Sequence, residues 1–442
     1  MTFEQFRVAV FEEAERLGCQ AAEVYYTKGE SFSVNVLDGE MESYEAERGG
    51  GLSLRVKKNG RDGYAYTETM ADPAGLAAHA ADNADVIENM DDHPMQGKSE
   101  YCRVQAPPCR AKDMTEREKI DLAKRLEIAV KQADPRVLRV QRCVVASQKG
   151  EVRIYNTLGL DAEEKRELIV DYAMPILGEN GEVKNAFAFR VGDKTLDVEG
   201  CAREAVEECA ALLGASPVAA GSYKVVIRND AMADLLAAFS SLFSADAAQK
   251  GLSLLKDKLG ETVAAEGVII VDDPFYRENP RAFDDEGVPC QTKNLVEHGV
   301  LKGFLHNLKT AKKAGVLSTG NAGRSPAGSL GVRPTNLYIL PGEKTLPALL
   351  EEMGNGLLIT EMDGLHAGLN PVSGEFSLIA KGRLIENGRD VRAVDQITVG
   401  GSFLTLMKAV RQVGGDLRFG IPGASCVGSP SVLVESLMVS GK

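Results

Sequence analysis

The polar loop Glu361–Gly374, which several glycines interrupt, is the segment of the sequence most suited to chemistry. It contains Asp363 and His366 three positions apart, and further on the amide of Asn370 and the hydroxyl of Ser373. An imidazole close to a carboxylate can share a proton or a metal ion with it, and polar loops often carry binding residues. We therefore predict that Asp363, His366, Asn370 and Ser373 contact a substrate.

A second candidate is the segment Phe304-Leu-His-Asn307, where two apolar residues precede His306 and Asn307. The pattern leaves two interpretations open. The histidine can belong to a structural hydrogen-bond network, or it can contact a substrate together with Asn307. We include both residues in the predicted substrate-binding set. No two histidines have H-E-x-x-H or H-x-H spacing, so we predict neither a metal site nor a catalytic residue in this chain.

Two acidic segments could bind a cation, but turns are the simpler interpretation. Asp272-Asp273 follows the apolar run Val268–Val271 at the end of a predicted strand. Asp284-Asp285-Glu286 is followed directly by glycine, valine and proline, which is typical of a strand break. We therefore expect a turn at the first segment and a solvated turn at the second.

Several common enzyme classes lack their signatures in this sequence. The nucleophile elbow G-x-S-x-G and the dinucleotide fingerprint G-x-G-x-x-G are both absent. The eight cysteines form no C-x-x-C pair, which excludes zinc ribbons and thioredoxin-like redox motifs. Their scatter is typical of reduced thiols in a cytosolic protein.

Composition and charge argue against nucleic acids and membranes as partners. The 442 residues are 44% hydrophobic and 26% charged, as in ordinary globular proteins, and the net charge is −13. Because nucleic-acid binding needs clustered lysine and arginine, and no basic run occurs, we expect no nucleic-acid ligand. Glutamates stand at positions 4, 12, 13 and 15, where a signal peptide would need an apolar core, and no apolar stretch approaches the length of a membrane span. We therefore predict a cytoplasmic protein without a membrane anchor.

Two segments repeat the order helix, strands, helix. Capping boxes at Thr2/Gln5 and Thr115/Glu118 begin the first helix of each segment. Alternating apolar residues then predict short strands between 32 and 67 and between 137 and 191. We place turns at 59–60, 149–150 and 180–181, and closing helices at 73–89 and 199–213. This similarity suggests two related modules joined by a proline-containing linker.

The sequence changes character at about residue 222, where glycine, proline and short strand-like segments become frequent. Helices are predicted at 231–243, 346–353 and 402–413, with hairpins at 298–299 and 387–388. The predicted fold class is α+β with mostly antiparallel sheets. The predicted domains are an N-terminal α+β module at 1–100, a central α+β module at 113–216 and a β-rich C-terminal domain at 222–442.

Five segments of the C-terminal half together resemble one known family. The segments are, in chain order, Phe283–Pro289, Phe304–Asn307, Ser318–Asn321, Pro334–Tyr338 and His366–Gly374. Together they strongly resemble the TldD/PmbA metallopeptidase family and, within it, the PmbA branch, which is also called TldE. The resemblance covers nearly the whole chain. It implies a cytosolic protein of three parts, associated with proteolysis of peptides and unfolded segments. Members of this family also carry an older label, modulator of DNA gyrase.

The sequence departs from this family at the zinc-binding helix. TldD-type members carry H-E-x-x-x-H there, with a cysteine further on, and these residues bind a catalytic zinc. Aligning the helix on Ala245-Asp246 places Leu236, Ala237 and Ser241 at the three motif positions. A small change of register does not restore the motif, because no histidine lies between residues 94 and 297.

Three functional hypotheses follow from the resemblance and this departure. In the leading one, the chain is a non-catalytic PmbA/TldE-type subunit that binds peptide substrate and joins a TldD-like, zinc-bearing partner. This chain then needs no cofactor of its own, and alone it can form a homodimer. In the second hypothesis, it is a peptidase in its own right that uses His306, His366 and Asp363. In the third, it is a non-enzymatic interaction protein that acts on gyrase or another partner.

Overall fold

The longest strands form one antiparallel sheet that runs through both predicted modules. The structure, a computed structural model, describes residues 1–87, 93–104, 109, 113–192 and 196–441. The sheet has the order β3-β2-β1-β4-β5-β6, and β7 pairs with β5. Its strands are β1 (Ala21–Leu37), β2 (Glu40–Lys58), β3 (Arg61–Thr67), β4 (Val137–Asn156), β5 (Asp161–Glu179), β6 (Glu182–Asn185) and β7 (Ala188–Gly192).

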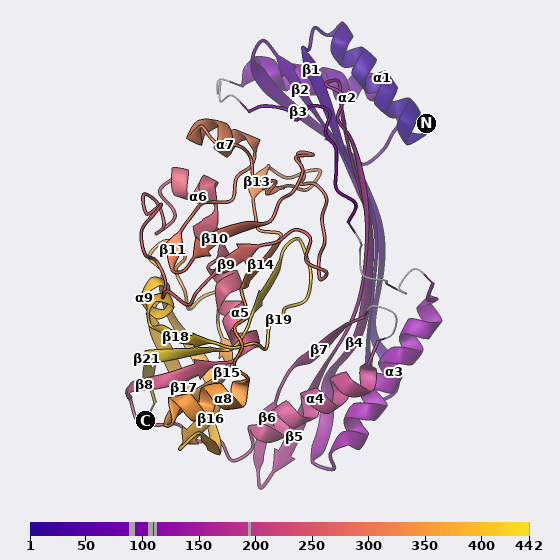
Figure 1. The fold of residues 1–442 in the computed structure, drawn as a ribbon. Coiled ribbons are helices and arrows are strands. Elements are labelled where there is room, and N and C mark those ends of the chain that lie inside the picture. The colour runs from indigo at the N-terminus through magenta and orange to yellow at the C-terminus, as the bar shows by residue number, and fades with distance from the viewer. Residues whose placement is uncertain (88–92, 105–108, 110–112, 193–195, 442) are drawn as a thin grey trace.

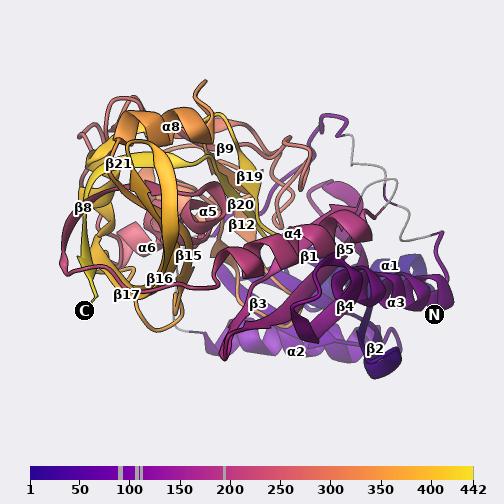
Figure 2. The ribbon, with the colours of Figure 1, turned by 90° about the horizontal axis from the view of Figure 1, so that it is seen from below.

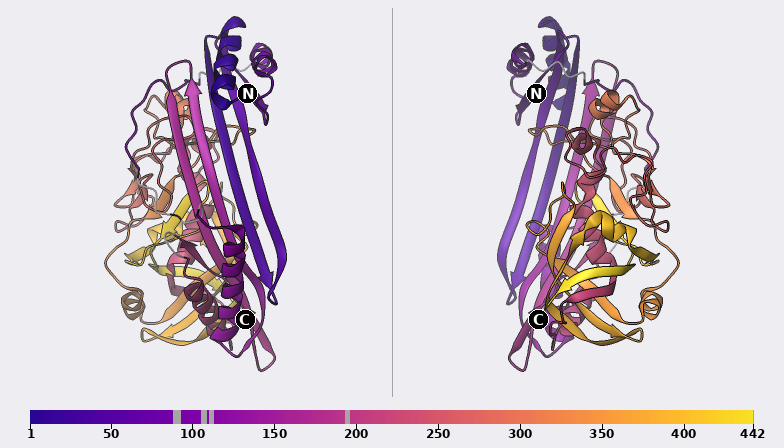
Figure 3. Two further views of the ribbon diagram at one scale, coloured as in Figure 1. Left: turned by 90° about the vertical axis from the view of Figure 1, so that its right-hand side faces the viewer. Right: turned by 90° about the vertical axis from the view of Figure 1, so that its left-hand side faces the viewer.

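Pairs of helices cover the two ends of this sheet. Within the described residues of the two modules, none of the helices covers its middle. Helices α1 (Phe3–Arg16) and α2 (Pro73–Val86) lie at one end, and α3 (Glu116–Ala133) and α4 (Val198–Ala211) lie at the other (Figure 1). The side views in Figure 3 show the strands running along most of the length of the molecule. The predicted helix–strands–helix order is confirmed in both modules, and their strands β1 and β4 pair directly from Glu23/Asn156 to Asn35/Val144. The predicted boundary between the modules therefore separates strands of a single sheet, and the domain limits stay a prediction.

The expected short strands and the turn at Lys149-Gly150 were wrong. Gly150 lies inside the continuous strand β4, where it pairs with Gly29 of β1 and Arg166 of β5. Because strands on both sides provide hydrogen-bond partners, the glycine is held in an extended conformation. The other two predicted turns are confirmed: Asn59-Gly60 and Asn180-Gly181 connect neighbouring strands with positive φ angles.

Each pair of helices packs on the sheet through a small apolar core. In the first module, Phe6, Val10 and Ala14 of α1 pack with Leu52 and Leu54 of β2, and all five are at most 1% exposed. In the second, residues of α3 and α4 pack together against β4 and β5. Both predicted capping boxes are present at the helix starts. Residues three and four positions apart therefore hold the helices on the sheet.

The C-terminal domain holds two six-stranded sheets and a short ribbon. One sheet has the order β17-β16-β15-β8-β21-β18, the other β11-β10-β9-β14-β20-β19, and β12 pairs with β13. Only β14–β20 and β15–β8 are parallel among the pairings of the described strands, which confirms a mostly antiparallel α+β fold. The strands are β8 (Gly221–Ile227), β9 (Ile270–Asp272), β10 (Lys293–Glu297), β11 (Val300–Leu301), β12 (Ala322–Gly323), β13 (Gly331–Val332), β14 (Asn336–Ile339), β15 (Gly356–Asp363), β16 (Glu375–Glu386), β17 (Arg389–Ser402), β18 (Val410–Val413), β19 (Arg418–Phe419), β20 (Cys426–Ser429) and β21 (Val432–Ser440).

Helices of this domain are shorter than the sequence predicts at two places. The predicted helix at 231–243 is α5 (Asn229–Ala238) followed by a 3₁₀ turn, η1 (Ser240–Phe243). The one at 402–413 is α9 (Phe403–Lys408), after which Val410 joins β18 and pairs with Val434. The remaining helices are α6 (Ala245–Gln249), α7 (Leu308–Ala314) and α8 (Leu346–Met353).

The C-terminal domain lies on the concave side of the long sheet, as Figures 1 and 2 show from two directions. Its large apolar core includes Leu235, Leu236 and Phe239 from the α5 region. Within the described residues, none of the helices has both the length and the apolar character needed to cross a membrane.

Candidate functional site

The acidic segment at 284–286 is buried, so the expected solvated turn was wrong. Asp284, Asp285 and Glu286 are at most 1% exposed. Both oxygens of Asp284 accept backbone N–H groups: one those of Glu286 and Val288, at 2.9 and 3.0 Å, and the other that of Ala322, at 2.8 Å. These bonds replace the water that the turn would otherwise require.

Two arginines compensate the charge of Asp285. Arg281 is 2% exposed and donates from Nη2 to Asp285 Oδ1 at 2.7 Å. Arg333 donates to Oδ2 at 2.6 Å. Although burial opposes ionisation, Arg281 and Arg333 lower the pKa of Asp285. Asp285 is therefore held as an anion between two cations.

Glu286 links the C-terminal domain to the first module. Its Oε1 lies 2.5 Å from Nε2 of His93, and its Oε2 accepts the backbone N–H of Leu308 at 2.8 Å. Burial raises the pKa of Glu286 and lowers the pKa of His93, so both groups favour their uncharged forms. A hydrogen bond between these two side chains thus joins segments 193 positions apart in the sequence.

A second contact between the same domains is made by Arg324. Its Nη2 donates to Glu23 of β1 at 3.0 Å, and its guanidinium lies 4.1 Å from the centre of the Tyr25 ring. The backbone N–H of Arg324 donates to Asp285 at 2.9 Å. Glu164 of β5 forms an ion pair with Arg166 and lies 3.9 Å from Nε of Arg281. We call these residues the charged cluster: Glu23, Glu164, Arg166, Arg281, Asp285, Arg324 and Arg333.

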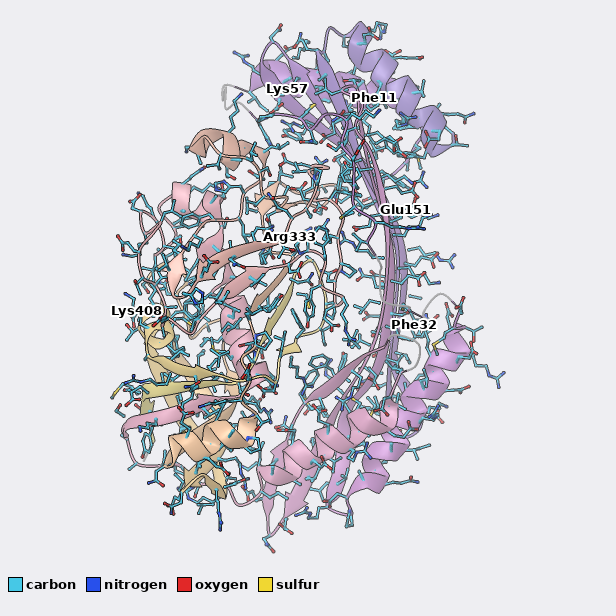
Figure 4. The ribbon with its side chains drawn as sticks, viewed as in Figure 1. Phe11, Phe32, Lys57, Glu151, Arg333 and Lys408 are labelled. Carbon is cyan, nitrogen blue, oxygen red and sulfur yellow. The ribbon has the colours of Figure 1, made fainter. Side chains whose placement is uncertain are left out.

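A cavity of about 850 Å³ lies beside the charged cluster, between the middle of the long sheet and the C-terminal domain. Arg333 in Figure 4 lies on the side of the C-terminal domain that faces the long strands, where Glu151 is labelled. The cavity is lined by parts of β1, β2, β4 and β5 and by segments of the C-terminal domain around residues 278–283 and 422–424. Its size is that of a site for a small molecule or a few peptide residues.

The structure gives His306 and Asn307 defined positions near the cluster. Asn307 is the N-cap of α7 and accepts the N–H of Thr310 at 2.8 Å, within a capping box. His306 is 8% exposed, and its backbone N–H donates to Thr319 at 2.7 Å. Burial lowers the pKa of His306, which favours the neutral imidazole. Asn307 thus has a clear structural role, and its predicted contact with substrate stays a prediction, as does that of His306.

The other predicted residues lie in or next to the loop that joins β15 and β16. Asp363 forms an ion pair with Lys381 at 3.2 Å, and His366 is exposed. Asn370 accepts the backbone N–H groups of Val372 and Ser373 at 2.9 and 3.2 Å, so its side chain shapes a turn. Among the described hydrogen bonds and ion pairs, none joins these residues to His306 or Asn307. Their predicted role in substrate binding stays a prediction.

Sequence reasoning missed the cluster because its partners lie far apart in the chain. Arg324 and Glu23 are separated by 301 positions, and Arg333 and Asp285 by 48. A usable signal was present, however. Three successive acidic residues directly after the apolar Phe283, with Arg281 two positions before it, fit a buried ion pair as well as they fit a turn.

Helix α5 and the 3₁₀ turn η1 contain the three positions where the family resemblance places the zinc motif of TldD-type members. Asp234, Ala237 and Ser241 are exposed, whereas Leu236 is fully buried in the core. Leucine, alanine and serine supply neither an imidazole nor a thiolate for zinc. Within the described residues, no group of three or more histidine, cysteine, aspartate or glutamate side chains is arranged to hold a metal ion.

Comparison with known proteins decides the family. Models of the PmbA/TldA metallopeptidase domain 1, central domain and C-terminal domain match residues 22–84, 109–213 and 220–441. The chain belongs to the PmbA/TldD metallopeptidase family. The resemblance predicted from the sequence is thereby confirmed.

Individual members of the PmbA/TldD family match along almost the full chain. A metalloprotease of Archaeoglobus fulgidus is 30% identical over 88% of this chain and 90% of its own. A metalloprotease PmbA homologue of Haemophilus influenzae is 27% identical over 95% and 92%. The crystal structure of a "putative modulator of a DNA gyrase" from Thermotoga maritima is 36% identical, with a TM-score of 0.92 over 99% of this chain and 100% of that one. The family fold is therefore present from end to end.

Proposed function

We propose that this chain is a PmbA/TldE-type subunit that acts with a zinc-bearing, TldD-like partner in the hydrolysis of peptides or unfolded segments. The observation that carries the proposal is the α5–η1 face, where a member of a metallopeptidase family presents Ala237 and Ser241 to the exterior. A catalytic zinc needs three protein ligands and an open position for water. The residues at this face do not fit such a site, so we assign the hydrolytic step to the partner.

The contribution of this chain is then to bind the substrate. β5 pairs with β7 and β6 only from Ile169 onward, so within the described residues no second strand pairs with the edge Asp161–Leu168. Residues 163–168 of the same edge line the cavity. An extended peptide can add to such an edge through main-chain hydrogen bonds, which bind without regard to side chains. This supports a role in holding unfolded segments.

The test compares the chain alone with the chain mixed with a homologue that carries H-E-x-x-x-H. Zinc content is measured by elemental analysis, and cleavage is measured with a fluorogenic peptide. We expect zinc and cleavage only in the presence of the partner, and loss of cleavage when the glutamate of the partner's motif is changed to glutamine. Stoichiometric zinc together with cleavage by the lone chain would refute the proposal.

A further inference from the structure

The charged cluster has one more positive than negative side chain. Four guanidinium groups stand against three carboxylates: Arg166, Arg281, Arg324 and Arg333 against Glu23, Glu164 and Asp285. The neighbouring groups change this balance little, because Arg55 pairs with Asp62 at 3.0 Å and burial favours the uncharged forms of Asp284, Glu286 and His93. The single carboxylate of Asp285 accepts hydrogen bonds from two arginines, Arg281 and Arg333.

The arginines also have more donors than the cluster has acceptors. A guanidinium carries five N–H donors in a fixed plane. In the part of the chain that the structure describes, the buried Nε atoms of Arg281, Arg324 and Arg333 have no hydrogen-bond partner. The Arg324 side chain is only 5% exposed, so its unpaired donor is deeply placed. Buried donors without acceptors are costly. These Nε atoms are closed to solvent, so a ligand in the cavity would meet the other N–H groups of the guanidinium planes.

Three of the four arginines line the cavity: Arg166, Arg324 and Arg333. Carboxylates line it too, but most of them pair with basic side chains of their own, as Glu163 does with Lys165 at 3.3 Å. Glu47 and Glu167 are matched in number by Lys28 and Lys149, which line the same cavity. The lining as a whole therefore has no excess of positive side chains, and the positive charge is local to the arginines.

We propose that this cavity binds one carboxylate of a peptide, with Arg324 and Arg333 as its donors and Arg166 beside them. One carboxylate would offset the excess charge of the charged cluster, and the planar guanidinium groups that line the cavity match its two oxygens. The open edge of β5 lines the same cavity, so a peptide added to that edge would lie beside the arginines. The inference rests on the proposed peptide binding and adds which chemical group of the peptide is recognised.

The carboxylate has two possible sources, the C-terminus of the peptide or an acidic side chain. Fluorescence anisotropy at constant ionic strength compares four labelled peptides of equal length. They have a free or an amidated C-terminus, each with one central Glu or Gln. Hydrogen bonds to charged groups contribute about 1.5–3 kcal/mol, so we expect about ten- to hundredfold tighter binding of the form that supplies the recognised carboxylate.

Variants identify the residues responsible. Arg333→Gln and Arg324→Gln should abolish the difference between carboxylate and amide peptides, and Arg333→Lys should retain part of it. Arg142→Gln is the matched control, because Arg142 is an exposed arginine of β4 outside the cavity. Circular dichroism verifies that each variant is folded, and Arg333→Gln is the milder change because its side chain is 31% exposed.

The possible outcomes separate this inference from the proposed function. Equal binding of all four peptides overturns the carboxylate site and leaves peptide binding intact. Binding of none of them overturns both. A carboxylate preference that survives Arg333→Gln and Arg324→Gln overturns the assignment to this cavity.

Discussion

Asp171 should make the stability of the long sheet near α3 depend on pH. It lies in β5, opposite Val145 of β4 and Arg190 of β7, and is 0% exposed. Burial raises the pKa of Asp171 to about 7, although Arg190 acts in the opposite direction. The folded state therefore binds this proton more strongly than the unfolded state does, in which an aspartate has a pKa of about 4.

The sign of the effect follows from this difference in proton binding. Between pH about 4 and about 7, the folded protein holds a proton that the unfolded chain has released, so stability falls as pH rises. Above pH 7 the full cost of the buried charge is present. Three pKa units correspond to about 4 kcal/mol, which is an upper estimate for the cost.

The perturbation is Asp171→Asn, which keeps the shape and removes the charge. We expect the variant to be more stable than the wild type by at most about 1.5 kcal/mol at pH 5, where the unfolded chain has already released the proton, and by up to about 4 kcal/mol at pH 8. Because the chain contains no tryptophan, unfolding is followed by far-UV circular dichroism. Asp161→Asn is the control, since Asp161 is exposed on the same strand. Parallel pH profiles of wild type and Asp171→Asn would refute the reasoning.

Two further predictions concern packing and the charged cluster. Gly63→Ala should destabilise the first module by about 1–3 kcal/mol, because a Cβ there would overlap the backbone of Ala80 and Ala84 in α2. Gly49→Ala, with open space around its Cβ, should change the thermal midpoint little, and an equal effect of both would contradict this. Arg281→Met should cost about 3–5 kcal/mol in denaturant unfolding, because it removes one of the two cations that hold buried Asp285. Lys250→Met, which breaks an exposed pair with Asp246, should cost at most about 1 kcal/mol; similar losses in the two variants would show that burial is not the cause.

Local features of the fold were predictable because neighbouring residues alone produce them. The capping boxes at Thr2 and Thr115 need only residues three positions apart, and both are present. The hairpins at Asn59-Gly60 and Asn180-Gly181 need only residues that accept positive φ, and both formed. Gly150 was misassigned because a glycine next to a lysine has the same local pattern in a turn and in a strand. Only its pairing with Gly29 distinguishes the two.

The candidate site could be predicted only in part. The five C-terminal segments were enough to identify the PmbA/TldD family, and the absence of H-E-x-x-x-H is visible in the sequence. The sequence does not show that Leu236 lies in the core while Ala237 and Ser241 face outward, because the strands that pack against α5 and η1 decide which side is buried. It also does not show which of the many charged residues become buried.

The amino-acid sequence by itself determined the helix starts, the tight turns, the α+β class and the family, since each depends on residue types at short spacing. The tertiary structure decided that an acidic segment is buried rather than solvated. It brought Arg333 and Arg324 to Asp285 and Glu23 across 48 and 301 positions, and it left an unbalanced guanidinium beside a cavity. The physical reason is that burial and charge pairing depend on chain segments that meet only after folding, and the sequence places no limit on how far apart those segments begin.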